Sequence, residues 1–177
     1  MPVVSIFGSS HFKPDSLEYE DAQLVGKLLA DAGFDIATGG YGGIMEAALK
    51  GANGTNVKRF GVTSKIFTSR TKNPFVSDEI IKDTYLDRTY ELINLADAYI
   101  VLPGGTGTLL ELAAIWALKE KKIMKDKPLV CIGDQWNEVI QTMEFYSDAA
   151  IDQFELIEHV DSGEEAVRII IRYFNKD

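Results

Sequence analysis

Cysteine and histidine are scarce in this chain, whose 177 residues include one cysteine and two histidines. A lone cysteine forms no disulfide within the chain, and Cys131 lies in an apolar run that favours a buried thiol. So few thiol and imidazole groups disfavour a transition-metal site and a Cys–His nucleophile. We therefore expect the protein to hold no metal ion and no cofactor.

Long apolar runs are also missing, because none approaches the roughly 20 residues that a transmembrane helix needs. The first six residues, MPVVSI, lack the basic leader of a signal peptide. These two absences predict a soluble, cytoplasmic protein with no membrane partner.

Positive charge is in the minority, since 18 lysines and arginines face 27 aspartates and glutamates and leave a net charge of −9. Nucleic-acid surfaces need clustered lysine and arginine, so this composition argues against a nucleic-acid partner. The densest basic stretch, residues 119–127, is interrupted by acids and is expected on a solvated face. A small anion remains compatible with the charge, because loop amides and one or two arginines bind it locally.

Two nucleotide-binding signatures are absent as well. No glycine-rich stretch reads G-x-G-x-x-G, the dinucleotide fingerprint, which disfavours a nicotinamide oxidoreductase. The pattern G-x-x-x-x-G-K-[ST] does not occur either, which excludes a P-loop nucleotide triphosphatase.

What the sequence does contain is an alternation of apolar strands and amphipathic helices from one end to the other. Almost wholly apolar strands that alternate with helices predict a parallel sheet covered on both faces. We expect one α/β domain over residues 1–177, with a three-layer, doubly wound, Rossmann-like fold. The predicted strands are 3–8, 34–38, 60–64, 98–102, 129–133 and 154–160, with a possible short strand at 79–81. Helices are predicted after Asp15 or Ser16, at 44–50, at 84–96, from about Thr106, at 136–145 and after Asp161 or Ser162.

Three loops rich in glycine or serine follow predicted strands, at residues 8–11, 38–43 and 103–108. Because parallel strands all point the same way, these loops are expected along one rim, where such sheets bind ligands. A strand–glycine loop–helix unit also leaves backbone N–H groups unpaired at the positive end of a helix dipole, which suits a phosphate. The candidate phosphate-binding residues are Gly104, Gly105, Thr106, Gly107 and Thr108, together with Ser9, Gly39 and Gly40.

Two charged residues are candidates for chemistry beside that rim. Glu111 lies about one turn into the helix after the third loop, as an acid beside the ligand or as the partner of Thr108 in a capping box. The local pattern alone favours the capping box. Arg88 lies at the margin of an apolar helix face, where it either pairs with Glu91 or Asp87 or grips a phosphate or substrate.

The two histidines receive different interpretations. His11 lies in the loop after the first strand, from which it could reach the ligand. His159 lies within the last predicted strand and is expected to be structural.

A family resemblance follows from these motifs. Residues 103–111, PGGTGTLLE, match in full the P-G-G-x-G-T-x-x-E signature of the LONELY GUY family of phosphoribohydrolases, which are often labelled lysine decarboxylase-like. Residues 39–45 resemble its second glycine motif, with Thr38 where a third glycine is usual, and residues 8–10 resemble its first loop.

The resemblance implies hydrolysis of a cytokinin nucleoside 5′-monophosphate, or of AMP, to a free base and ribose 5-phosphate. It implies that Glu111 and Arg88 are the catalytic pair, that residues 104–108 hold the phosphate, and that the protein is a homodimer. Similar loops occur in the related molybdenum-cofactor carrier proteins, which bind their ligand without consuming it. A non-catalytic nucleotide or cofactor carrier is therefore the alternative.

The chain departs from the family pattern at two places. The second signature usually reads M-H-x-R-K-x-x-M, and here only Arg88 remains of it, with Thr89 in place of the lysine. This replacement removes a positive charge from the expected site. Glu46 stands where those enzymes often carry glycine.

Overall fold

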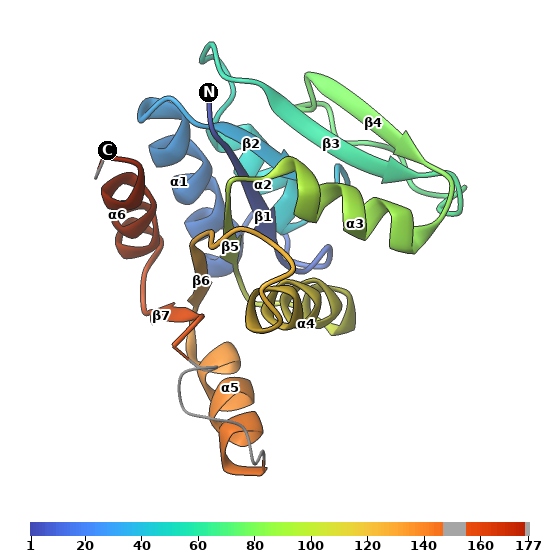
Figure 1. Ribbon diagram of the computed structural model, residues 1–177. Helices are drawn as coiled ribbons and strands as arrows, with labels where there is room; N and C mark the ends of the chain where they lie inside the picture. Colours follow the sequence, from blue (N-terminus) through green and yellow to red (C-terminus); the bar gives the residue numbers. More distant parts are fainter. Residues whose placement is uncertain (147–154, 176–177) are drawn as a thin grey trace.

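A seven-stranded parallel sheet forms the centre of the protein, shown in Figure 1. The computed structural model describes residues 1–146 and 155–175. The strands lie in the order β4-β3-β2-β1-β5-β6-β7, and every neighbouring pair is parallel. Their bounds are β1 Val3–Phe7, β2 Asp35–Thr38, β3 Arg59–Ser64, β4 Asp78–Lys82, β5 Ala98–Val101, β6 Leu129–Ile132 and β7 Glu158–Val160. The predicted doubly wound α/β fold is confirmed.

Helices cover both faces of the sheet because side chains alternate along each strand. Val4 and Ile6 of β1 pack into one apolar cluster, and Val3 and Phe7 pack into the other. The first cluster lies under α1 (Leu17–Asp31), α2 (Ile44–Gly51) and α6 (Gly163–Phe174). The second lies under α3 (Tyr85–Leu95), α4 (Thr106–Glu120) and α5 (Asp134–Tyr146). Cys131 is fully buried in this second cluster, as predicted.

The order in which the chain adds strands to the sheet reverses beside β1, and this position is the topological switch point. The chain steps outward from β1 through β2 and β3 to β4, and then returns to place β5 on the other side of β1. The segments that follow β1 and β5 therefore diverge from neighbouring strands, which is where open α/β sheets bind ligands. The N–H of Ser9 donates to the carbonyl of Pro103 at 3.1 Å and holds the two segments together.

Three of the helices begin at a side-chain cap. The hydroxyls of Ser16, Thr84 and Ser162 accept from the backbone N–H three residues later, which satisfies an amide that has no partner within the helix. Helices α2 and α4 begin instead at Gly43 and Gly105, which have no side chain to act as a cap, and no described side chain accepts from the first amides of α4. The start of α4 is thus left open to another hydrogen-bond acceptor.

Two sequence predictions are wrong in detail. The last strand was expected over 154–160, but it begins at Glu158 and pairs only with the short stretch 130–132 of β6; residue 154 lies outside the described residues. Lys119 was expected on a solvated face, yet its side chain is buried. Its ammonium pairs with Asp126 at 2.9 Å and donates to the carbonyl of Lys127. These two partners compensate for the removal of the positive charge from water.

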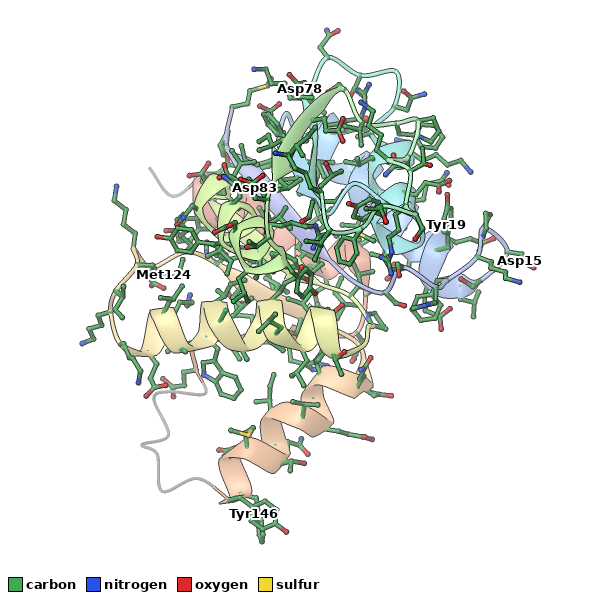
Figure 2. All side chains as sticks on the ribbon, turned by 90° about the vertical axis from the view of Figure 1, so that its right-hand side faces the viewer. Asp15, Tyr19, Asp78, Asp83, Met124 and Tyr146 are labelled. Carbon is green, nitrogen blue, oxygen red and sulfur yellow. The ribbon has the colours of Figure 1, made fainter. Side chains whose placement is uncertain are left out.

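Helix α5 extends away from the sheet, so that Tyr146 at its end is exposed (Figure 2). Trp136, in the first turn of this helix, is the α5 residue that the core buries. Within residues 1–146 and 155–175, no helix combines the length and apolar character that crossing a bilayer requires.

Candidate functional site

A cavity of about 400 Å³ opens at the switch point between β1 and β5. It is bounded by the segments that follow β1, β2, β3 and β5 and by one side of α3. Eight of the ten candidate residues line it, namely Ser9, Gly39, Arg88, Gly105, Thr106, Gly107, Thr108 and Glu111. The expectation that loops far apart in the sequence meet at one rim therefore agrees with the described structure.

Gly40 and Gly104, the other two candidates, are not among the residues that line the cavity. Gly40 has a φ of +76°, and a Cβ there would lie 3.0 Å from the Thr63 side chain, so glycine is needed for the turn. The N–H of Gly104 donates to Oε1 of Gln135 at 3.0 Å, and Nε2 of Gln135 donates to the Gly104 carbonyl at 2.6 Å. These two glycines shape the loops.

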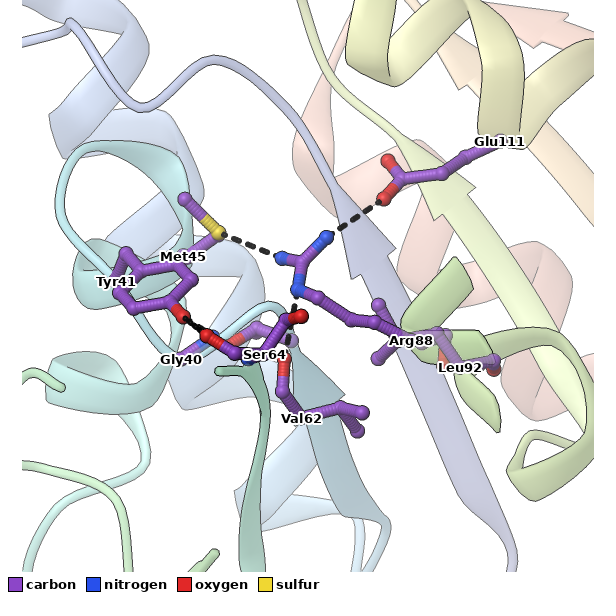
Figure 3. Close-up of polar contacts among 10 residues, drawn as sticks. Gly40, Tyr41, Met45, Val62, Ser64, Arg88, Leu92 and Glu111 are labelled. Atoms are coloured by element: carbon purple, nitrogen blue, oxygen red, sulfur yellow. Dashed lines mark hydrogen bonds and ion pairs between the residues drawn. The ribbon is translucent and has the colours of Figure 1, made fainter. Parts of the chain in front are cut away.

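The floor of the cavity is a buried ion pair, drawn in Figure 3. Nη1 of Arg88 lies 3.7 Å from Oε1 of Glu111, and the two residues are 5% and 6% exposed. Nε of Arg88 donates to the carbonyl of Val62 at 2.8 Å, and Nη2 lies 3.8 Å from the sulfur of Met45. The guanidinium is thus fixed from two sides and faces the carboxyl group from a third.

Gly39 makes room for that guanidinium. A Cβ on Gly39 would lie 1.6 Å from Nη2 of Arg88, so any larger residue would displace the arginine. The pairing of Arg88 with Glu91 or Asp87, which the sequence left open, is wrong. Glu91 pairs instead with Lys82 at 2.8 Å, and Asp87 accepts from the Thr84 hydroxyl.

The capping box of Thr108 and Glu111 is also wrong. Helix α4 already begins at Thr106, because the carbonyl of Gly105 accepts from the N–H of Leu109 and starts the helical ladder. Thr108 therefore lies inside the helix, where its side chain cannot act as an N-cap. The Glu111 side chain points across to Arg88 and leaves the helix start without a cap.

Burial changes the acidity of Glu111. Removal from water raises the pKa of its carboxyl group to about 7, and the positive charge of Arg88 opposes that rise. A carboxyl group with a pKa near neutrality exchanges protons readily at physiological pH, which is the property expected of a general base or acid.

One wall of the cavity was missed from the sequence. Ile66, Phe67 and Arg70 come from the segment between β3 and β4, and Met45 and Tyr85 come from α2 and α3. Phe67 contacts the rings of Tyr41 and Tyr85 edge-on, with centroids 5.6 and 5.7 Å away. The available signal was length, because a long connection with no secondary structure of its own is often functional.

Of the departures from the family pattern, Tyr85 at the first position of the second signature lines the cavity, whereas Thr89 and Glu46 lie outside the lining. Thr89 is 4% exposed on the sheet side of α3, and its hydroxyl has no hydrogen-bond partner among the described residues. Position 89 does not line the cavity in this chain. Glu46 accepts from the hydroxyl of Tyr19 at 3.2 Å, and burial together with Glu46 raises the pKa of Tyr19 to about 12.

The two histidines lie in different surroundings. His11 is exposed at the mouth of the cavity, with Nδ1 3.4 Å from the Ser9 hydroxyl. His159 lies on β7, where Nε2 is 3.1 Å from the carbonyl of Gly133.

Fold and site together define a Rossmann-like protein with an uncapped helix start and a buried acid–arginine pair in one cavity at the switch point. Its sequence matches the model of the SLOG cluster4 family over residues 1–160. The chain belongs to this family, and the resemblance to the LONELY GUY phosphoribohydrolases is confirmed at this level.

Two relatives have named activities. The chain is 34% identical over 119 residues to the cytokinin riboside 5′-monophosphate phosphoribohydrolase of Mycobacterium tuberculosis, a match that covers 66% of this chain and 63% of that protein. It is 32% identical over 126 residues to the pyrimidine/purine nucleotide 5′-monophosphate nucleosidase of Escherichia coli K12, covering 66% of this chain and 28% of that protein. Both matches thus span less than two thirds of the relative.

A solved structure shares the whole fold. The molybdenum cofactor binding protein of Rippkaea orientalis superposes with a TM-score of 0.79 at 20% identity, and the match covers 98% of this chain and 97% of that protein. At this identity the likeness shows the shared fold.

Proposed function

We propose that the protein hydrolyses the N-glycosidic bond of a purine nucleoside 5′-monophosphate, AMP or a cytokinin-type nucleotide, to the free base and ribose 5-phosphate. The observation that carries this proposal is one cavity that holds both the uncapped start of α4 and the buried Glu111–Arg88 pair. The names of the two relatives support the same reaction class.

The start of α4 provides the phosphate site of this proposal. Gly105, Thr106, Gly107 and Thr108 line the cavity, and no described side chain accepts from their amide N–H groups. Free amides and the positive end of the helix dipole bind a phosphate without a lysine. Glu111 lies one to two turns further along the same helix, so a bound 5′-phosphate directs the ribose toward the buried pair.

Glu111 then serves the chemistry at C1′. As the bond from C1′ to the base nitrogen breaks, its electron pair leaves with the base and the sugar carbon becomes positively charged. The Glu111 carboxylate stabilises that charge and takes a proton from the attacking water, whose hydroxyl joins C1′. The proton that Glu111 removes balances the one that the departing base acquires. Arg88 holds the carboxylate in place and orients the sugar.

We also propose a homodimer that forms around α3 and α4, which pack beside each other near the cavity (Figure 1). Leu86 and Tyr90 on α3 are 66% and 62% exposed, and Leu109 and Leu110 on α4 are also exposed. Apolar groups gathered beside a cavity favour a protein partner. Light scattering after gel filtration should give twice the monomer mass, and Leu86→Glu should lower it.

The test of the function is incubation with AMP and measurement of adenine and ribose 5-phosphate. Glu111→Gln should reduce release at least 100-fold, in the range for loss of a general base, and leave AMP affinity within a few-fold. Glu46→Gln is the matched control, because Glu46 is a nearby acid outside the lining. A Glu111→Gln variant that turns over normally would show that the carboxyl group is not catalytic.

The alternative is a carrier that binds its ligand in the same cavity without cleaving it, as the fold match to a cofactor-binding protein suggests. In that case wild type would bind AMP or a molybdenum cofactor and release no base.

A further inference from the structure

Arg70 is a cation in the cavity lining that none of the described acids pairs with. Its guanidinium carbon lies 4.8 Å from the ring centroid of Phe67 and 5.6 Å from that of Tyr41. Among the residues that the structure describes, no carboxylate pairs with it. Its neighbours differ, since Lys65 pairs with Asp83 at 2.6 Å and Lys72 with Glu79 at 3.0 Å. The acids near this segment, Asp83 and Glu79, therefore form ion pairs with lysines and not with Arg70.

Aromatic contacts place Arg70 next to the start of α4. Phe67, which carries the guanidinium on its face, packs edge-on against Tyr85 at 5.7 Å. The hydroxyl of Tyr85 in turn lies close to the helix start, because a Cβ built on Gly107 would be 2.7 Å from it. Burial and the charge of Glu111 raise the pKa of Tyr85, whereas Arg88 and Arg70 oppose the rise, which is consistent with both arginines lying near that hydroxyl.

The two arginines of the cavity are not equivalent. Arg88 is buried and already has partners within the protein, since Nε donates to the Val62 carbonyl and Nη1 faces Glu111. Arg70 is exposed, and although its backbone N–H donates to the Phe67 carbonyl, its guanidinium N–H groups make no hydrogen bond to a described residue. A guanidinium that stacks on aromatic rings keeps its edge free to donate two parallel hydrogen bonds to a phosphate.

We propose that Arg70 is a phosphate-binding residue, which holds the 5′-phosphate of the substrate against the amides of Gly105, Thr106 and Gly107. This inference rests on the proposed function for the identity of the ligand as a sugar phosphate. Arg70 and residues 105–106 share the exposed rim, whereas Arg88 and Glu111 share the buried floor. The charged end of the ligand therefore lies toward solvent, and the sugar points inward.

The assignment also accounts for the missing family lysine. Thr89 occupies the lysine position and does not line the cavity, so a second positive charge must come from another element. Arg70 supplies it from the segment between β3 and β4. The cavity then holds two cations and one acid whose pKa lies near neutrality, which suits a phosphate dianion.

The test compares four probes by calorimetry: AMP, ribose 5-phosphate, inorganic phosphate and adenosine. Arg70→Met keeps an unbranched side chain over the rings and removes the charge. It should weaken AMP and both base-free phosphates about tenfold, as expected for lost charge-assisted hydrogen bonds, and leave adenosine unchanged. Lys72→Ala is the matched control, because it removes one charge from the same segment outside the lining. Thermal unfolding of both variants checks that the fold is retained.

Three results would overturn the assignment. A loss shared by AMP and adenosine but not by ribose 5-phosphate would mean that the guanidinium stacks on the base. Unchanged affinities in Arg70→Met would mean that Arg70 only covers the aromatic rings. An equal loss for every probe would mean that it merely supports the cavity wall. If wild type binds ribose 5-phosphate through Arg70 yet releases no adenine from AMP, hydrolysis fails while the phosphate assignment stands.

Discussion

The floor and the rim of the cavity use charge under opposite physical conditions. On the floor, Arg88 and Glu111 are removed from water, so every N–H and oxygen must find a partner inside the protein. On the rim, Arg70 and the start of α4 remain in contact with water and leave their donors free. A preorganised, dry floor is suited to altering the reactivity of an acid, and a wet rim with free donors is suited to capturing an anion.

This difference separates binding from chemistry in one small site. Changes to the floor should act on the rate and on stability together, because its groups are packed into the core. Changes to the rim should act on ligand affinity and spare the fold. Variants that break this rule would show that the two regions are not independent.

Among the changes that leave Glu111 in place, the largest effect is expected from Gly39→Ala. Its methyl group would overlap Nη2 of Arg88, so the arginine must leave both the Val62 carbonyl and Glu111. We expect turnover of AMP to fall about 100-fold, as displacement of a positioned catalytic group does, and the protein to lose about 2 kcal/mol of stability. Steady-state kinetics and chemical denaturation measure the two effects. Normal turnover would show that Arg88 is not needed in this position.

Gly105→Asp reverses that pattern on the rim. A Cβ at Gly105 meets no atom within 4 Å, and an aspartate at an N-cap accepts from the free amides of its own helix. The variant should be as stable as wild type, yet bind ribose 5-phosphate about 30-fold more weakly because its carboxylate occupies the anion site. Gly105→Asn caps without charge and should weaken binding less. Undiminished binding in Gly105→Asp would place the phosphate elsewhere.

Three glycines of the site also show what the sequence could and could not predict. Glycine runs after apolar strands identified the rim, because parallel strands must end on one side. The part each glycine plays was not predictable, since it depends on neighbours from distant elements. Gly39 faces a guanidinium from α3, Gly104 is bonded to Gln135 on α5, and Gly105 faces open space.

The same limit explains the errors around Glu111. The capping box was inferred from a local pattern with Thr108 as N-cap, but the N-cap of α4 is Gly105, three residues earlier. Arg88 was given local partners, whereas its acid comes from the next helix. Arg70 and Phe67 had no periodic pattern to reveal them, because they reach the cavity through tertiary contacts alone.

The raised pKa of Glu111 predicts how both turnover and stability depend on pH. If its carboxylate is the base, kcat/KM should rise about tenfold between pH 6 and 8, since the pKa is about 7. Folding raises this pKa from 4.5 to about 7, so the folded state binds the proton more tightly than the unfolded state does. The free energy of unfolding should therefore fall by about 3 kcal/mol as the pH rises from about 4.5 through 7. Glu111→Gln should remove that slope from stability curves measured at several pH values. A slope that persists in Glu111→Gln would assign it to other carboxyl groups.

The smallest effect is expected from Gln135→Ala, which tests how the rim itself is held. The Gln135 amide bonds to both the N–H and the carbonyl of Gly104, one residue before the anion-binding amides begin. Without it the loop loses two exposed hydrogen bonds, so KM for AMP should rise about threefold while kcat stays nearly constant. Gln141→Ala is the matched control, because that side chain donates to Asn137 on the same helix and lies outside the cavity lining. A fall in kcat in Gln135→Ala with unchanged KM would mean that a change in the loop alters the positions of Arg88 and Glu111. Floor and rim would then not be independent.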